Sequence, residues 1–158
     1  MNETFPPVAV ALAAFLHHLA AFGIVAALTL EYALLRGALT ARSVRQVQVA
    51  DLVYGIAAGV VLAIGFFRVF YFEKGSAYYF HSAPFIAKLT LFALVGLASI
   101  YPTVEFLSWG RDLKQGRVPS LPERKMTLLR TIVAWELAGL VLIILCAALM
   151  ARGIGFFG

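Results

Sequence analysis

Hydrophobic residues are concentrated in four long runs, separated by short stretches rich in basic residues, proline and glycine. The runs span residues 8–35, 49–72, 84–108 and 127–151. Each run is long enough to supply the ~20 residues that an α-helix needs to cross the hydrocarbon core of a bilayer. We therefore predict an all-α integral membrane protein, in which residues 1–158 form a single domain folded as a four-helix transmembrane bundle.

The composition supports a membrane protein and argues against a soluble one. Of the 158 residues, 62% are hydrophobic and 13% are charged, whereas roughly a quarter of the residues of a soluble domain carry charge. The net charge of +5 does not indicate nucleic-acid binding, because the basic residues lie beside the apolar runs, where they usually record membrane topology. The only cysteine, Cys146, excludes a disulfide within the chain.

The basic residues are distributed unevenly among the connections between the runs. The second connection contains Lys74 alone, whereas the first and third are basic, with Arg36, Arg42, Arg45, Arg111, Lys114, Arg117, Arg124 and Lys125. The positive-inside rule places the first and third connections in the cytoplasm, so that both termini lie outside. The first run is too long for a cleaved signal peptide. We predict that it is a permanent helix of a multi-pass protein in a bacterial inner membrane.

Two adjacent histidines lie inside the first run, in the sequence Phe15-Leu-His-His-Leu19. Ionisable side chains within a membrane segment are costly and are a functional hypothesis by default. Neighbouring residues of an α-helix point about 100° apart, and Glu31 projects in nearly the same direction as His17. A stripe that carries both an imidazole and a carboxyl group favours the bundle interior. We therefore predict that His17 faces inward, and we keep His18 as a second candidate.

A rise of ~1.5 Å per residue assigns the other polar side chains of the runs to depths in the membrane. From the outside inward, the predicted layers are Arg68 and Lys88; His17, His18 and Glu136; and Glu31, Asp51, Glu105 and Arg130. We interpret the innermost layer as a set of ion pairs.

Three roles are open for His17. It is an axial ligand to haem iron, part of a proton relay with Glu136 and Glu31, or a neutral imidazole bonded to a neighbouring helix. His17 and His18 cannot readily bind one metal ion, because their side chains diverge. Arg68 and Lys88 either extend to the membrane interface or bind the propionates of a porphyrin whose iron lies at His17.

Small residues and prolines give further expectations. Gly55 and Gly59 form a small-xxx-small pattern, which allows close helix packing, contact with a flat ligand, or contact with a second copy in a homo-oligomer. Pro102 predicts a kink in the third helix, because proline lacks the amide hydrogen. Residues 40–45 are predicted to form a polar bridge. The sequence from Ser120 to Glu123 predicts a capping box before the last helix.

Several motifs together resemble a bacterial family of small four-helix membrane proteins of unknown function. They are Phe15-Leu-His-His-Leu19, Asp51-Leu-Val-Tyr-Gly55, Phe70-Tyr-Phe-Glu-Lys-Gly75, Lys88-Leu89 and Ser99-Ile-Tyr-Pro-Thr103. The resemblance covers nearly the whole chain and implies the same fold.

A more distant resemblance is to the membrane protoporphyrinogen oxidases of haem synthesis. That family has four helices with basic first and third connections, a Leu-His pair in the first helix and a Lys-Leu pair in the third. The corresponding residues here are Leu16-His17 and Lys88-Leu89. The resemblance implies haem b binding at His17 and a functional role for Lys88. Two family histidines are replaced, by Ile86 and by Pro102 in the Tyr101-Pro102 pair, so a second axial ligand is not identified.

Copper-resistance membrane domains have a similar helix pattern, but this chain lacks the methionine and cysteine content that suits Cu(I). The leading hypothesis is therefore a haem b-binding or porphyrin-handling membrane protein, with His17, His18, Arg68 and Lys88 as its site. A quinone is a further candidate partner for an oxidoreductase of this kind. The alternative is a small proton-coupled transport or accessory subunit without a cofactor, in which Glu136 and Glu31 carry protons.

Overall fold

The computed structural model describes residues 5–72 and 81–157, and four long helices account for most of them. Helix α1 spans Pro7–Arg36 and α2 spans Ala41–Phe67, after which the π-helical turn η1 covers Arg68–Phe72. Helix α4 spans Ala83–Lys114 and α5 spans Glu123–Ala151. The four long helices are each apolar and long enough to cross a membrane. This confirms the predicted four-helix membrane bundle. Lys74, in the second connection, lies outside the described residues.

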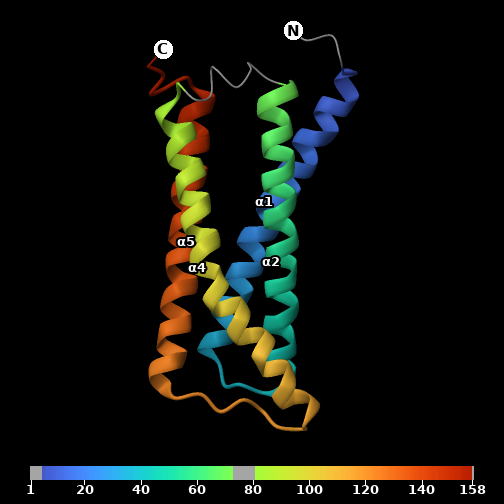
Figure 1. The fold of residues 1–158 in the computed structure, drawn as a ribbon, viewed down its shortest axis with the longest axis vertical. Coiled ribbons are helices and arrows are strands. Elements are labelled where there is room, and N and C mark those ends of the chain that lie inside the picture. The colour runs from blue at the N-terminus through green and yellow to red at the C-terminus, as the bar shows by residue number, and fades with distance from the viewer. Residues whose placement is uncertain (1–4, 73–80, 158) are drawn as a thin grey trace.

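The helices form two antiparallel hairpins, α1 with α2 and α4 with α5. Contacts are most extensive within each hairpin, α1 also packs on α5, and α2 and α4 make fewer contacts than these pairs. The start of α1 and the end of α5 lie at one end of the bundle, and the connections 37–40 and 115–122, which basic residues flank, lie at the other (Figure 1). We call these the terminal end and the loop end. Helix α1 is inclined, so that its N-terminal part leans away from α5 (Figure 1).

Three helices extend further toward the loop end than predicted. Helix α2 begins at Ala41 rather than near residue 49, because Thr40 and Ser43 form a capping box. The Ser43 amide donates to Thr40 Oγ1 at 3.1 Å, and the Thr40 amide donates to Ser43 Oγ at 2.8 Å. Residues 41–45 are therefore helical, and the predicted polar bridge is wrong. Helix α4 likewise continues past residue 108 to Lys114.

The predicted capping box before the last helix is also wrong. Helix α5 begins at Glu123, directly after Pro122, and no side chain caps its first turn. Proline has no side-chain oxygen to accept a hydrogen bond. The Glu123 carboxylate instead accepts a hydrogen bond from Arg130 at 3.2 Å.

The tightly packed core lies in the half of the bundle nearer the loop end. Its fully buried members come from all four helices and include Leu28, Leu35, Val44, Val47, Phe106, Trp109, Leu129 and Val133. Toward the terminal end, a much smaller cluster contains Val69 and Phe85. Large apolar side chains such as Phe22 and Trp135 are exposed on the outside, as expected where lipid rather than water surrounds the helices.

Polar bonds join α2 to α4 near the loop end. Gln48 Nε2 donates to the carbonyl of Phe106 at 2.7 Å, and Thr103 Oγ1 donates to Asp51 Oδ1 at 2.6 Å. Helix α4 is continuous through the buried Pro102, and its second half leans toward α2 (Figure 1). This change of direction agrees with the predicted kink, and it allows the two bonds to form.

Close packing of α4 on α5 provides a test of the fold. A Cβ atom at Gly139 would lie 2.6 Å from Val95 Cγ2, and valine is too stiff to move aside easily. We expect Gly139→Ala to lower the free energy of unfolding by about 1–3 kcal/mol through overpacking. Gly59→Ala is the control, because a Cβ atom there meets nothing within 4 Å.

Thermal unfolding followed by circular dichroism in mild detergent measures both variants. The double variant Gly139→Ala/Val95→Ala should recover part of the lost stability, because it removes the clashing methyl groups. Equal melting temperatures for Gly139→Ala and Gly59→Ala would show that α4 and α5 are not packed in this way.

Candidate functional site

The ring of His17 lies between α1 and the exposed backbone of Gly65 on α2. A Cβ atom at residue 65 would lie 3.4 Å from His17 Cε1, so the glycine leaves just enough room for the imidazole. The ring is half-buried and also faces the backbone of Val61. Its Nδ1 atom is buried and makes no hydrogen bond with a described residue. His17 therefore faces inward, as its angular position predicts, and presents an unbonded ring nitrogen.

His18 has a different environment. Its side chain is exposed, and its Nδ1 forms a 2.6 Å hydrogen bond with the Ala14 carbonyl of its own helix. The rings of His17 and His18 are nearly perpendicular, with their centres 6.0 Å apart. The two histidines thus diverge, and the structure does not bring His18 into the same site.

The structure brings two cations from other elements toward His17. Arg68 begins the π-helical turn η1 at the end of α2, and Lys88 lies in the first half of α4. Both interact electrostatically with His17, and both are half-buried. The Lys88 ammonium also lies 5.5 Å from the centre of the Phe85 ring. We call His17, Arg68 and Lys88 the histidine layer.

A second polar layer lies nearer the loop end and contains three buried carboxyl groups. Glu31 of α1 is 1% exposed, Glu136 of α5 is 2% exposed and Asp51 of α2 is 9% exposed. These groups interact electrostatically with one another, and the buried Tyr54 interacts with all three. We call Glu31, Asp51, Glu136 and Tyr54 the carboxyl layer.

The place of Glu136 corrects one prediction. Depth along parallel helices put Glu136 beside His17, but its electrostatic neighbours belong to the carboxyl layer, whereas those of His17 are Arg68, Lys88 and His18. The reason is the inclination of α1 (Figure 1). His17 lies on the part of α1 that leans away from α5, whereas Glu31 lies on the part that packs against it.

Hydrogen bonding in the carboxyl layer is incomplete within the described residues. Asp51 accepts the bond from Thr103, and the Tyr54 hydroxyl lies beside Ser99. The Oε1 atoms of Glu31 and Glu136 are buried and have no hydrogen-bond partner there. Buried polar atoms usually have partners, and exceptions are common at sites that handle protons or ligands.

The predicted ion-pair set is wrong in its partners. Glu105 pairs with Lys125 at 2.8 Å and accepts a hydrogen bond from Trp109 Nε1 at 3.0 Å. Arg130 binds Glu123 and donates to the carbonyl of Leu35 at 2.7 Å. These bonds close the loop end of the bundle. They leave Glu31 and Asp51 without a cationic partner among the residues that the structure describes.

Metal binding by protein ligands alone is not a feature of the described chain. Across residues 5–72 and 81–157, no group of three or more histidine, cysteine, aspartate or glutamate side chains is placed to hold a metal ion. A metal at His17 would therefore need a group that brings its own ligands, as a porphyrin does for iron.

A cavity of about 770 Å³ lies between α2 and α4 beside the carboxyl layer. Polar side chains line part of it, and they are Gln48, Asp51, Tyr54, Ser99 and Thr103. Gly55 and Gly96 line it as well, and a Cβ atom at either position would meet nothing within 4 Å. This cavity was not predicted from the sequence. The relevant signal was the small-xxx-small pattern at Gly55 and the matching small residues Gly96 and Ser99 on α4.

The comparison with known protein families identifies the class of the chain. Residues 9–155 match the family described as predicted membrane protein DUF2214. The chain belongs to this family. No curated protein and no solved structure matches it. Membership in DUF2214 confirms the predicted membrane family of unknown function, and the likeness to the membrane protoporphyrinogen oxidases stays a prediction.

The bond between Thr103 and Asp51 gives a test of the DUF2214 carboxyl layer. Thr103→Val removes the only described donor to Asp51 Oδ1, and an unsatisfied buried acceptor costs about 1–3 kcal/mol. Thr29→Val is the matched control, because the exposed Thr29 hydroxyl bonds only to the Val25 carbonyl of its own helix.

We expect Thr103→Val to lower the melting temperature of the protein in detergent, and Thr29→Val to leave it nearly unchanged. If both variants have the melting temperature of the parent protein, the hydrogen bond from Thr103 to Asp51 does not stabilise the fold.

Proposed function

We propose that this DUF2214 protein binds haem b, or a related porphyrin, in a bacterial inner membrane, with His17 as an axial ligand. The observation that supports the proposal is the inward ring of His17, with a buried Nδ1 atom that has no hydrogen bond to a described residue and two cations within electrostatic range. A neutral imidazole in an apolar environment is the ligand that haem iron commonly takes in proteins.

The other members of the histidine layer suit the periphery of a porphyrin. Haem carries two propionates, and Arg68 and Lys88 approach the site from two different elements, η1 and α4. Cationic side chains bind carboxylates through short charge-assisted hydrogen bonds. Gly65 leaves room for the His17 ring against the backbone of α2.

His17 would ligate the iron of a bound haem. His18 points away and bonds to its own helix, so it would not take part. A bound haem would supply one-electron chemistry at its iron. The chain would hold the group through His17, bind its carboxylates through Arg68 and Lys88, and exclude water with the surrounding apolar side chains.

Replacement of each histidine tests the proposal. The protein purified in mild detergent, after addition of haem, should show a Soret band that falls to background in His17→Ala and persists in His18→Ala. The two residues are adjacent on one helix, so the pair controls for a general effect on α1. Far-UV circular dichroism confirms that both variants remain helical.

A parent protein that stays colourless after haem addition would overturn haem binding. Proton flux into liposomes that depends on Glu136 without any chromophore would support the alternative function, a small proton-coupled subunit.

A second candidate function is supported by the cavity between α2 and α4. Its walls are mostly apolar and it has a few converging polar groups, which is typical of small-molecule sites. It is lined by exposed apolar residues such as Leu52 and Ile56, so a molecule dissolved in the membrane can enter from the side. We propose that it binds a quinone.

The lining of the cavity suits a flat ring with oxygen atoms at its edge. Gly55 and Gly96 leave bare backbone on both helices, against which a flat ring can lie. The Tyr54 hydroxyl can donate to a quinone oxygen, and Asp51 can accept from a quinol hydroxyl. Glu31 and Glu136 interact electrostatically with Asp51 and Tyr54, so they could exchange protons with a quinone bound beside those two residues.

Filling the cavity tests quinone binding separately from haem binding. Gly96→Leu places a side chain in the open space of the cavity, and we expect the affinity for the short-tailed quinone decylubiquinone to fall by at least about tenfold. Gly59→Leu is the matched control, because it adds the same side chain at an open position outside the cavity.

Calorimetric titration in detergent measures the two affinities. Equal quinone binding by Gly96→Leu and Gly59→Leu would remove the cavity as the site, whatever the result with haem.

A further inference from the structure

A second concave site lies on the outside of the α1–α2 hairpin near the loop end. It has a volume of about 470 Å³, and its lining residues are Leu30, Ala41, Arg42, Arg45, Gln46 and Val49. Neither the haem site nor the quinone cavity includes these residues. The site therefore needs a separate explanation.

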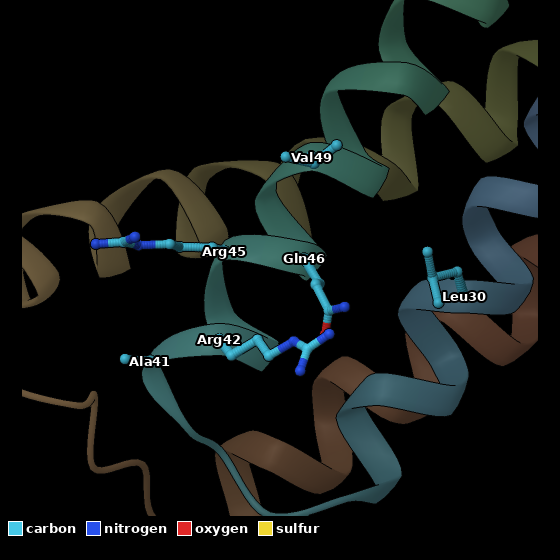
Figure 2. Close-up of a pocket in the computed structure, with 6 residues that line it drawn as sticks. All are labelled: Leu30, Ala41, Arg42, Arg45, Gln46 and Val49. Carbon is cyan, nitrogen blue, oxygen red and sulfur yellow. The ribbon is translucent and has the colours of Figure 1, made fainter.

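The lining is divided into a polar wall and an apolar wall. The guanidinium of Arg42 and the carboxamide of Gln46 point into the same space, which Leu30 faces from α1 (Figure 2). Val49 continues the apolar wall one turn along α2, and both Leu30 and Val49 are exposed. The guanidinium of Arg45 extends in another direction, away from Arg42 (Figure 2). Arg42 and Gln46 therefore form the polar centre.

The charge of this site is not neutralised by the described part of the chain. Some cations at the loop end have carboxylate partners, such as Lys125 with Glu105 and Arg130 with Glu123. Neither Arg42 nor Arg45 forms an ion pair with a described residue. Arg42 also lies in the first turn of α2, where the partial positive charge of a helix N-terminus adds to that of the guanidinium.

These features favour the binding of an anionic amphiphile. A guanidinium and an amide donate hydrogen bonds to phosphate oxygens, while Leu30 and Val49 offer apolar surface on the membrane side. The lining contains neither a carboxylate nor an aromatic ring, and these are the groups that would hold the ammonium of a zwitterionic headgroup. Basic pockets beside transmembrane helices at the cytoplasmic surface bind anionic lipids by this chemistry.

We propose that this site binds one anionic phospholipid of the phosphatidylglycerol type. Its phosphate lies between Arg42 and Gln46, and an acyl chain runs along Leu30 and Val49. The capping box formed by Thr40 and Ser43 supports the site, because it holds the first turn of α2 in the geometry that presents Arg42.

Native mass spectrometry of the purified protein, titrated with phosphatidylglycerol or phosphatidylcholine, tests the proposal. Phosphatidylglycerol should bind at least about tenfold more tightly, and Arg42→Gln should remove this preference. Arg124→Gln is the matched control, because Arg124 occupies the same position in the first turn of α5 at the same end of the bundle but lines no part of this site.

A second variant separates lipid binding from folding. Gln46→Glu is nearly isosteric, and its carboxylate lies one turn from Arg42, where it pairs with the guanidinium. We expect it to lose the preference for phosphatidylglycerol while its melting temperature stays at or above that of the parent protein.

Three results would overturn the proposal. They are equal binding of the two lipids, equal effects of Arg42→Gln and Arg124→Gln, and displacement of the lipid by millimolar inorganic phosphate. The last result would show a site for free phosphate rather than for an intact lipid.

Discussion

The close approach of α1 to α2 determines where the polar side chains of this bundle lie. A Cβ atom at Gly23 would be 3.6 Å from Ala57 Cβ, and one at Gly65 would be 3.4 Å from the His17 ring. Small residues at these points let the two helices pack closely, although lipid offers little hydrophobic force to bring them together. Because α1 packs along α2, it leans away from α5 at the terminal end and meets α5 near the loop end (Figure 1).

This geometry separates two kinds of electrostatic environment. His17 lies where α1 leans away from α5, and its charged neighbours Arg68 and Lys88 are cations. Glu31 lies where α1 reaches α5, and its neighbours Asp51 and Glu136 are acids. An anionic group such as a propionate is favoured in the first environment and disfavoured in the second. A neutral ligand that exchanges protons suits the second, which is why haem and quinone are proposed for different layers.

The same packing explains why the open space of the bundle lies between α2 and α4. With α1 occupying one side of α2, the other side meets α4 mainly through Gln48 and Asp51 near the loop end. Beyond these bonds, Gly55 and Gly96 leave a cavity that apolar side chains do not fill. The loop end is closed by ion pairs, and Arg42 lies on its outer side, so the three proposed sites occupy different parts of the molecule.

A large part of the fold and a smaller part of the candidate site follow from local properties of the chain. Four apolar runs determine four membrane-spanning helices, because the hydrocarbon core requires each backbone polar group to be bonded within its own segment. The 100° step of the helix distinguishes His17 from His18. The basic residues beside the first and third connections predict that these two connections lie at the same end of the bundle. These properties depend on residues close together in the sequence.

The tertiary structure alone decided which side chains meet. Glu136 lies with Glu31 and Asp51 rather than with His17, and Glu105 pairs with Lys125, because the tilt of α1 and the added helical turns at the loop end change the relative positions of the helices. The cavity beside Tyr54 and the site at Arg42 also require two helices at a particular separation. Periodicity and depth describe one helix at a time, whereas tilt and separation depend on side chains from several helices packing together.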